Sequence, residues 1–190
     1  MKAVFISDAH LRRSTDERYS QFVQFLADLR DGKVRTLVDA QEVGRDKTPI
    51  DDLYILGDLF DFWFCSKDRI HPEFQVVIHS LVDLQKTGVH IHLCEGNHDF
   101  FMKEYFHDVL GMEVFEEWAD IKLDKLRMLV AHGDTADRSN RTYMMFRKIL
   151  RSRPFYNIQR VIPASARWTL AGMTSNASKQ MSDDNCDFLV

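Results

Sequence analysis

Four short polar clusters in this chain combine carboxylate, imidazole and amide side chains at close spacing. They read SDAH (7–10), GDLFD (57–61), GNHD (96–99) and HGD (132–134). Carboxylate and amide oxygens together with imidazole nitrogens suit Mn²⁺, Fe²⁺ or Zn²⁺, and they differ from the thiolates of a soft-metal site. A divalent ion held by such groups lowers the pKa of a bound water toward neutrality. The clusters therefore indicate metal-dependent chemistry.

Each cluster directly follows an apolar run that predicts a β-strand. The predicted strands are Ala3–Ser7, Leu53–Leu56, Val89–Glu95, Ala119–Leu123 and Arg127–Ala131. Because ligands bind at the carboxyl edge of an α/β sheet, we expect the clusters to meet there. A lone Asp after a strand is usually a turn residue, but four such clusters in order favour a site.

Helical spacing of apolar residues alternates with these strands and predicts an α/β fold. The predicted helices are Asp16–Leu29, Pro72–Lys86 and Lys103–Leu110. Residues 31–52 are polar and irregular, which predicts a surface excursion. The remaining histidines are expected at surface or packing positions, since an isolated His is more often found there than at a site.

Composition places the chain among ordinary globular proteins, with 45% hydrophobic and 28% charged residues. No apolar run approaches the roughly 20 residues of a membrane span. The three cysteines are odd in number and lack C-x-x-C spacing, which favours reduced thiols in the cytosol. We expect a cytoplasmic protein, with peripheral contact at the inner face of the membrane through its apolar cap residues.

The charge distribution separates an acidic body from a basic arm. Residues 138–182 contain nine Lys and Arg and no Asp or Glu, so the rest of the chain carries −13. The arm predicts a helix from Arg138 to Leu150, a break near Pro154 and a bend at Pro163. We expect a core over residues 1–137, a helical cap insertion over 138–182, and the start of a further core segment over 183–190.

The ordered set D-x-H, GD-x-x-D, GNH-D and HGD resembles the calcineurin-like metallophosphoesterase superfamily over residues 1 to about 134. The resemblance implies a four-layer α/β/β/α sandwich holding two divalent ions. It implies Asp8 and His10 as ligands of the first ion and Asp58 as the bridge. Asn97 and His132 would bind the second ion.

Two further residues match positions that act on the substrate. His98 matches the imidazole that faces the substrate phosphate, and Asp61 matches the carboxylate that orients it. Two ions about 3.5–4 Å apart can share a hydroxide and hold both ends of an in-line displacement at phosphorus. His98 would protonate the leaving oxygen or stabilise the transition state. Mn²⁺ is the expected ion, with Fe²⁺ and Zn²⁺ as alternatives.

One branch of the superfamily resembles this chain further, through GDLFDFWF, HGDT and the segment TYMMFRKILRSRP (142–154). The branch comprises the UDP-2,3-diacylglucosamine pyrophosphohydrolases of lipid A synthesis, which release UMP and a lipid 1-phosphate. Such a substrate needs cations beside an apolar groove, and we predict Arg141, Tyr143, Arg147 and Arg151 as substrate-binding residues. The alternative is the solvated face of an ordinary amphipathic helix.

Two departures from the family pattern keep other functions open. His98 stands where the branch commonly has Arg, and no His follows His132, whereas the superfamily has a late G-H-x-H segment. We therefore expect a truncated chain with an impaired site. The alternatives are a phosphoesterase for another lipid, a nucleotide or a nucleic acid, although the acidic body disfavours nucleic acid, and an inactive phosphate-binding scaffold.

Overall fold

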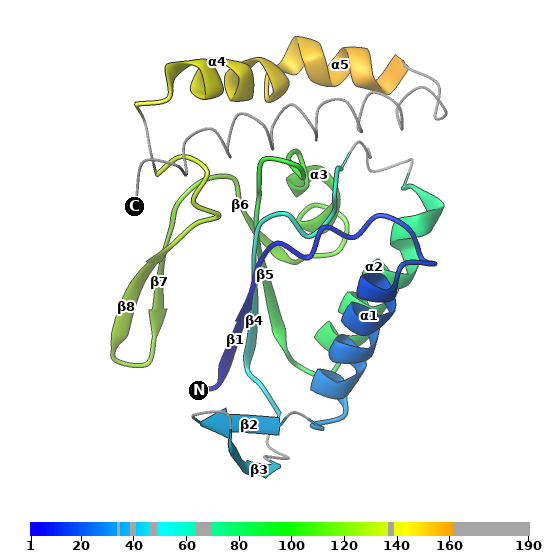
Figure 1. Ribbon diagram of the computed structural model, residues 1–190, viewed down its shortest axis with the longest axis vertical. Helices are drawn as coiled ribbons and strands as arrows, with labels where there is room; N and C mark the ends of the chain where they lie inside the picture. The colour runs from blue at the N-terminus through cyan, green and yellow to red at the C-terminus, as the bar shows by residue number, and fades with distance from the viewer. Residues whose placement is uncertain (34, 39–40, 46–48, 64–69, 137–138, 162–190) are drawn as a thin grey trace.

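A parallel β-sheet forms the centre of the computed structural model, which describes residues 1–161 except 34, 39–40, 46–48, 64–69 and 137–138. The strand order is β1–β4–β5–β6 (Figure 1). These strands span Ala3–Ile6, Asp52–Leu56, His90–Cys94 and Glu113–Phe115. Helices alternate with the strands, so the expected α/β fold is confirmed.

Two helices cover one face of this sheet. They are α1 (Glu17–Arg30) and α2 (Gln75–Gln85), the latter preceded by the 3₁₀ turn η1 (Pro72–Phe74). Their apolar stripes pack on the buried side chains of β4 and β5 in one continuous core. Removing this surface from water is the main force that fixes the strands, and hence the loops that follow them.

An antiparallel hairpin, β7 (Ala119–Leu123) with β8 (Leu126–Val130), lies toward the other face. Its inner residues Ala119, Ile121 and Val130 pack against Tyr54 and Cys94 of the parallel sheet. The described residues thus contain a helical layer, a parallel sheet and a hairpin. The full four-layer sandwich stays a prediction.

The segment predicted to be a surface excursion contains a second hairpin, which the sequence did not predict. Strands β2 (Arg35–Val38) and β3 (Gln41–Arg45) pair antiparallel there. The sequence also failed to predict β6, because three residues are too few to show a period. Helix α3 covers only Lys103–Phe106, and the residues up to Leu110 continue it as turns.

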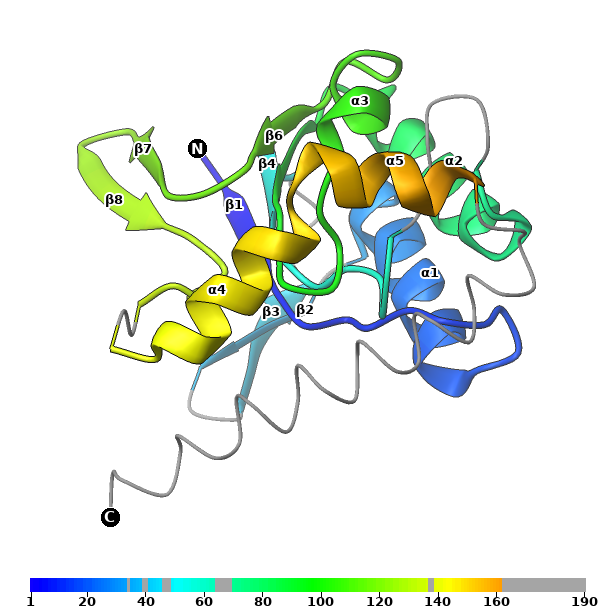
Figure 2. The same cartoon turned by 90° about the horizontal axis from the view of Figure 1, so that it is seen from above.

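Helices α4 (Arg141–Leu150) and α5 (Arg153–Val161) extend over the carboxyl ends of the strands (Figures 1 and 2). The first begins three residues later than predicted, because the Asn140 side chain caps it by accepting the Tyr143 N–H at 3.0 Å. Pro154 lies in the first turn of α5, where proline is tolerated.

The predicted bend at Pro163 lies outside the described residues, and the division into core, cap and further core segment stays a prediction. Among the helices described, none is both long and apolar enough to cross a bilayer.

Candidate metal centre

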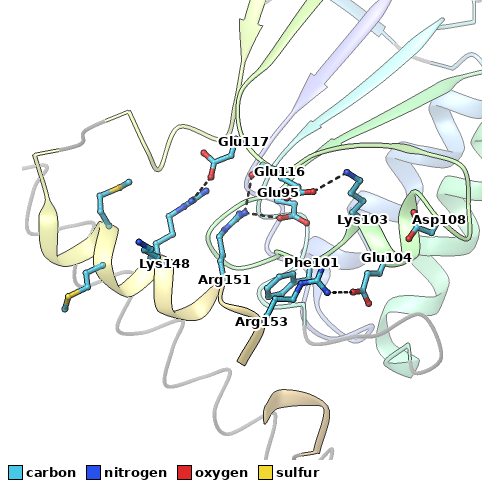
Figure 3. A pocket seen from close by; sticks show the side chains of 13 residues that line it. Glu95, Phe101, Lys103, Glu104, Asp108, Glu116, Glu117, Lys148, Arg151 and Arg153 are labelled. Carbon is cyan, nitrogen blue, oxygen red and sulfur yellow. Dashed lines mark hydrogen bonds and ion pairs between the residues drawn. The ribbon is translucent and has the colours of Figure 1, made fainter. Parts of the chain in front are cut away.

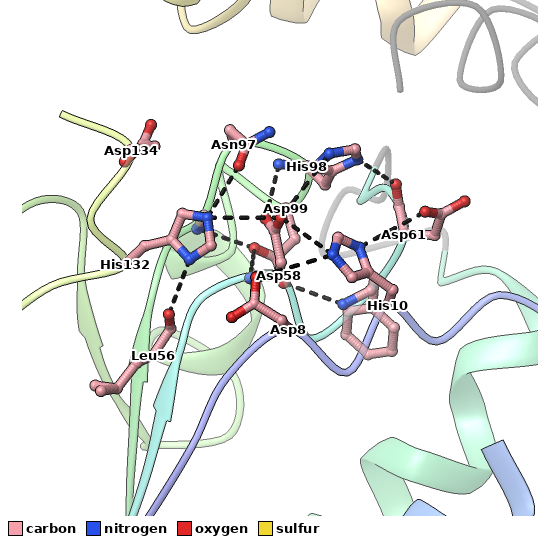
Figure 4. A network of polar contacts seen from close by, with 12 residues as sticks. Asp8, His10, Leu56, Asp58, Asp61, Asn97, His98, Asp99, His132 and Asp134 are labelled. Carbon is pink, nitrogen blue, oxygen red and sulfur yellow. Dashed lines mark hydrogen bonds and ion pairs between the residues drawn. The ribbon is translucent and has the colours of Figure 1, made fainter. Parts of the chain in front are cut away.

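The loops that follow β1, β4, β5 and β8 converge above the sheet and bring together every metal ligand that the sequence predicts (Figure 4). The residues are Asp8, His10, Asp58, Asn97 and His132, with Asp61 and His98 beside them. Backbone pairing holds the first two loops in register beyond their strands, since His10 N–H donates to the Asp58 carbonyl at 2.9 Å.

Asp58 lies at the centre of the cluster and is 2% exposed. Its Oδ1 accepts the His98 backbone N–H at 3.0 Å. Its Oδ2 faces the Nε2 atoms of three imidazoles, at 3.7 Å for His10, 3.8 Å for His98 and 3.6 Å for His132. These separations exceed a hydrogen bond and leave Oδ2 directed toward a space bounded by nitrogen ligands.

His132 and Asn97 present lone pairs to each other, and this fits a shared cation. His132 Nδ1 lies 3.0 Å from the Leu56 carbonyl, which can only accept, so Nδ1 carries a proton. In the neutral imidazole, Nε2 is then an acceptor, and it lies 2.9 Å from Asn97 Oδ1. A rotated Asn97 amide, a proton or a metal ion would each make this contact favourable, and the adjacent carboxylate and imidazole ligands suit the metal.

A second set of ligand atoms suits the other ion. One atom each from Asp8, His10 and Asp58 lie within 4.8 Å of one another, and the same holds for His10, Asp61 and His98. Carboxylate oxygen with imidazole nitrogen is the donor set of Mn²⁺, Fe²⁺ and Zn²⁺ sites. The residues present therefore fit a divalent metal.

Three of these ligands stand in the left-handed backbone region. The φ angles are 56° for Asp8, 46° for His10 and 51° for Asp58. Such conformations cost of order 1–3 kcal/mol each in non-glycine residues and cluster at functional sites. Here they turn the side chains of two adjacent strands toward one point.

Two glycines permit the close approach of the loops. A Cβ built on Gly57, whose φ is +87°, would lie 2.6 Å from the His132 ring. One built on Gly96 would lie 2.1 Å from Asp58 Oδ1. Any side chain at either position would displace a predicted metal ligand.

Asp99 is a structural carboxylate that sequence reasoning left without a role. It is fully buried and accepts the backbone N–H groups of Gly96 at 2.9 Å, Asp58 at 3.0 Å and Phe60 at 3.1 Å. Burial and the nearby charge of Asp58 raise its pKa, against the three N–H donors, which lower it. Asp99 thus ties the second loop to the third, and its place in the GNHD cluster was the available signal.

His98 is oriented by a backbone atom of Asp61. Its Nδ1 lies 3.0 Å from the Asp61 carbonyl oxygen, and its Nε2 points toward Asp58. The Asp61 carboxylate, predicted to orient His98, lies 3.7 Å from His10 Nδ1. The main-chain carbonyl of Asp61, rather than its carboxylate, therefore contacts His98. The carboxylate lies beside His10, a predicted ligand of the first metal.

Of the four predicted substrate-binding residues, one is exposed and three are bound to the loops below α4. Arg141 is exposed at the start of α4. Tyr143 OH and Arg147 Nε donate to Asp134 Oδ2 of the fourth cluster at 2.8 and 2.7 Å. Arg147 also donates to Glu117 at 2.9 Å, and burial followed by the Asp134 charge raises the pKa of Tyr143.

Arg151, the fourth of these residues, is bound to the third loop. Its guanidinium donates to the Gly96 carbonyl at 2.8 Å and to Glu95 Oε2 at 3.0 Å. Burial raises the pKa of Glu95 to about 7, while the charge of Arg151 and the N–H of Met102 act in the opposite direction. Sequence reasoning did not select Glu95, because it reads as the last residue of a strand.

A groove of about 1010 Å³ lies between α4, α3 and the loop after β6 (Figure 3). Glu95 and Arg151 line its inner end, next to the third loop. Its other lining residues are of three kinds: the apolar Phe101, Met144 and Met145; the basic Lys103, Arg147, Lys148 and Arg153; and the acidic Glu104, Asp108, Glu116 and Glu117. The groove adjoins the candidate metal centre.

The α/β fold and the candidate centre are consistent with a metallophosphoesterase, and comparison with known families shows this class. Residues 1–182 match the calcineurin-like phosphoesterase family. The chain belongs to this family and so to the hydrolytic phosphoesterase enzymes, which use divalent metals.

The curated relatives narrow the comparison. A UDP-2,3-diacylglucosamine hydrolase of Hamiltonella defensa is 32% identical over 90% of this chain and 60% of its own length. Proteins of the same name from Neisseria meningitidis and Pseudomonas putida are 29% and 31% identical, each over 93% of this chain and 67% and 66% of theirs. The chain thus spans about two thirds or less of these relatives.

Proposed function

We propose that the chain hydrolyses a pyrophosphate bond in a nucleotide-linked lipid, converting UDP-2,3-diacylglucosamine to UMP and a lipid 1-phosphate. The observation that carries the proposal is the convergence of Asp8, His10, Asp58, Asn97 and His132 at one sheet edge. The names of the relatives supply the substrate.

Asp8 and His10 would hold one divalent ion, Asn97 and His132 the other, and Asp58 both. When bound, the pair of ions supplies Lewis acidity at phosphorus and a water of lowered pKa. Mn²⁺ is the ion we propose, with Fe²⁺ and Zn²⁺ compatible with the same ligands.

His98 would act on the leaving group. The Asp61 carbonyl fixes the proton on Nδ1, so that Nε2 faces the cluster at 3.8 Å from Asp58 Oδ2. In the protonated imidazole, Nε2–H can be donated to the departing oxygen or to charge on the phosphoryl group. Arg commonly stands here in the proposed branch, and an imidazolium can serve the same electrostatic purpose.

A lipid substrate is proposed over a nucleic acid for two reasons. Phe101, Met144 and Met145 of the groove could contact acyl chains near the candidate metal centre, although the other ten lining residues are charged. Arg147 and Arg151 are already paired with carboxylates of the body, which weakens the case for a basic surface that follows a phosphate backbone. A lipid substrate would also bring the chain to the cytoplasmic face of a membrane.

A competition assay tests the substrate. The chain, Mn²⁺, UDP-2,3-diacylglucosamine and bis(p-nitrophenyl) phosphate are combined, and products are followed by mass spectrometry. We expect UMP and the lipid phosphate, with the generic diester largely intact. Cleavage of the generic diester alone would retain the metal chemistry and remove the lipid substrate. No turnover of either would support the non-catalytic scaffold.

A further inference from the structure

The inner face of α4 contacts two of the loops that carry predicted metal ligands. Tyr143, Arg147 and Arg151 follow one another at intervals of four residues, so their side chains lie on one side of the helix. Together with Asn97, Phe100 and Leu150 they line a small crevice between the helix and the third loop. The helix therefore packs directly on a ligand-bearing segment.

Arg151 holds the third loop by its main chain. The guanidinium donates to the Gly96 carbonyl at 2.8 Å, to Glu95 Oε2 at 3.0 Å and to the Glu116 carbonyl at 3.1 Å. It also lies 5.5 Å from the centre of the Phe100 ring. Figure 3 shows the fork directed at the loop rather than along the groove. A substrate phosphate would have to compete with these protein acceptors for the guanidinium.

Glu95 extends the same connection into the core. Its side chain is 3% exposed, and while Oε2 accepts from Arg151, Oε1 accepts the Met102 N–H at 2.8 Å. While Glu95 is ionised, its pairing with Arg151 stabilises the charge, since an unpaired charge in the interior is strongly unfavourable. Arg151 and Glu95 therefore fix the chain on both sides of Asn97 and His98.

The fourth loop is held by the neighbouring turns of the helix. Asp134, two residues after His132, accepts from Tyr143 at 2.8 Å and from Arg147 at 2.7 Å. His132 is the predicted partner of Asn97 at the second metal. Both predicted ligands of that metal thus lie within two residues of a contact with α4.

We propose that α4 is a positioning element for the second metal ion, with Arg151 as its principal residue, rather than a phosphate-binding helix. This inference rests on the proposed function and goes beyond it. It states that contacts from α4 hold the side chains of Asn97 and His132 in position for the metal ion. Partners of this kind that orient metal ligands typically affect metal affinity 10- to 100-fold.

Mn²⁺ titration of Arg151 variants tests the proposal without the lipid substrate. In Arg151→Met we expect one of the two Mn²⁺ dissociation constants to rise about 10- to 100-fold, with the other nearly unchanged. Arg151→Lys restores the charge but not the fork, so it should recover only part of the loss. Arg127→Met is the matched control, because it breaks an exposed guanidinium–carboxylate pair with Asp120 on the hairpin.

The possible outcomes separate the roles of Arg151. Unchanged Mn²⁺ affinity with a higher KM for UDP-2,3-diacylglucosamine would make Arg151 a substrate-binding residue and overturn the proposal. Unchanged affinity with only a lower unfolding temperature would reduce it to an anchor of the cap, which also overturns it. Absence of Mn²⁺ binding in the unaltered chain would instead contradict the proposed function itself.

Discussion

The strand-end loops and the inner face of α4 meet at the same site but were predictable to different degrees. In the loops, residue type and place after a strand indicated which side chains would come together, and the structure gathers them around Asp58. On α4 the sequence offered cations at helical spacing, and two of the three arginines predicted to bind substrate pair with the body instead. The residue types in the four clusters by themselves indicate metal binding. The role of an arginine on a helix depends instead on which groups it contacts in the folded protein.

The acidic body and basic arm show the same lesson at larger scale. The opposite charges suggested a metal on one side and an anionic substrate on the other. In the structure some of those charges neutralise each other across the cap, as in Arg147 with Glu117 and Arg151 with Glu95. Charge counts alone cannot distinguish internal pairing from ligand binding.

The largest effect is expected from Asp58→Asn, because Asp58 lies at the centre of the predicted ligands. The amide keeps the shape of the side chain but removes the charge that would join both ions. We expect hydrolysis of UDP-2,3-diacylglucosamine to fall by about 10³-fold or more, equivalent to several kcal/mol of transition-state stabilisation. Steady-state rates at saturating Mn²⁺ measure this, and a loss below tenfold would contradict the central place of Asp58.

The next largest effect is expected from Gly96→Ala, which should lower turnover about 10²-fold. The added methyl would lie 2.1 Å from Asp58 Oδ1, so the predicted bridging carboxylate must move. Gly88→Ala is the control, because Gly88 has a φ of +98° but an open surrounding. It should lower the free energy of unfolding by about 1 kcal/mol and spare turnover. Equal turnover in both variants would rule out the steric argument.

A smaller effect is expected from Tyr143→Phe, which tests whether α4 positions the second metal ion or binds substrate. Losing the phenol's hydrogen bond to Asp134 should weaken Mn²⁺ binding about tenfold while KM stays constant. Arg141→Met, at the exposed start of the same helix, should leave Mn²⁺ affinity unchanged. Calorimetric titration of the two variants measures the difference, and a reversed order would return α4 to substrate binding.

The last prediction concerns the pH dependence of stability at Cys94, which is buried in the parallel sheet. Burial, with a lesser contribution from Asp99, raises its pKa from 9.0 to about 11. The folded chain therefore retains the thiol proton longer than the unfolded chain. The thiol's contribution to the free energy of unfolding is complete below pH 9 and is lost as the pH rises toward 11, by at most about 2.7 kcal/mol for two pKa units. Unfolding curves of Cys94→Ala should lack this part of the decline, and identical curves would contradict the shift.

The sequence predicted the α/β fold and the convergence of the loops because alternation of elements and strand-end chemistry are local signals. It did not predict the β2–β3 hairpin or the three-residue strand β6, whose periods are too short to detect. The place of Asp99 in the GNHD cluster did not reveal its connecting function, since that function depends on three backbone N–H groups from two separate loops. Contacts between distant segments require the structure.

Electron paramagnetic resonance of the chain titrated with Mn²⁺ tests most directly whether these loops form a two-metal centre. Two ions about 3.5–4 Å apart share ligands and couple magnetically. We predict a spin-coupled spectrum as the second equivalent binds, and its loss in Asp58→Asn. Only isolated-ion signals at saturating Mn²⁺, with the same spectrum in the variant, would contradict the two-metal account.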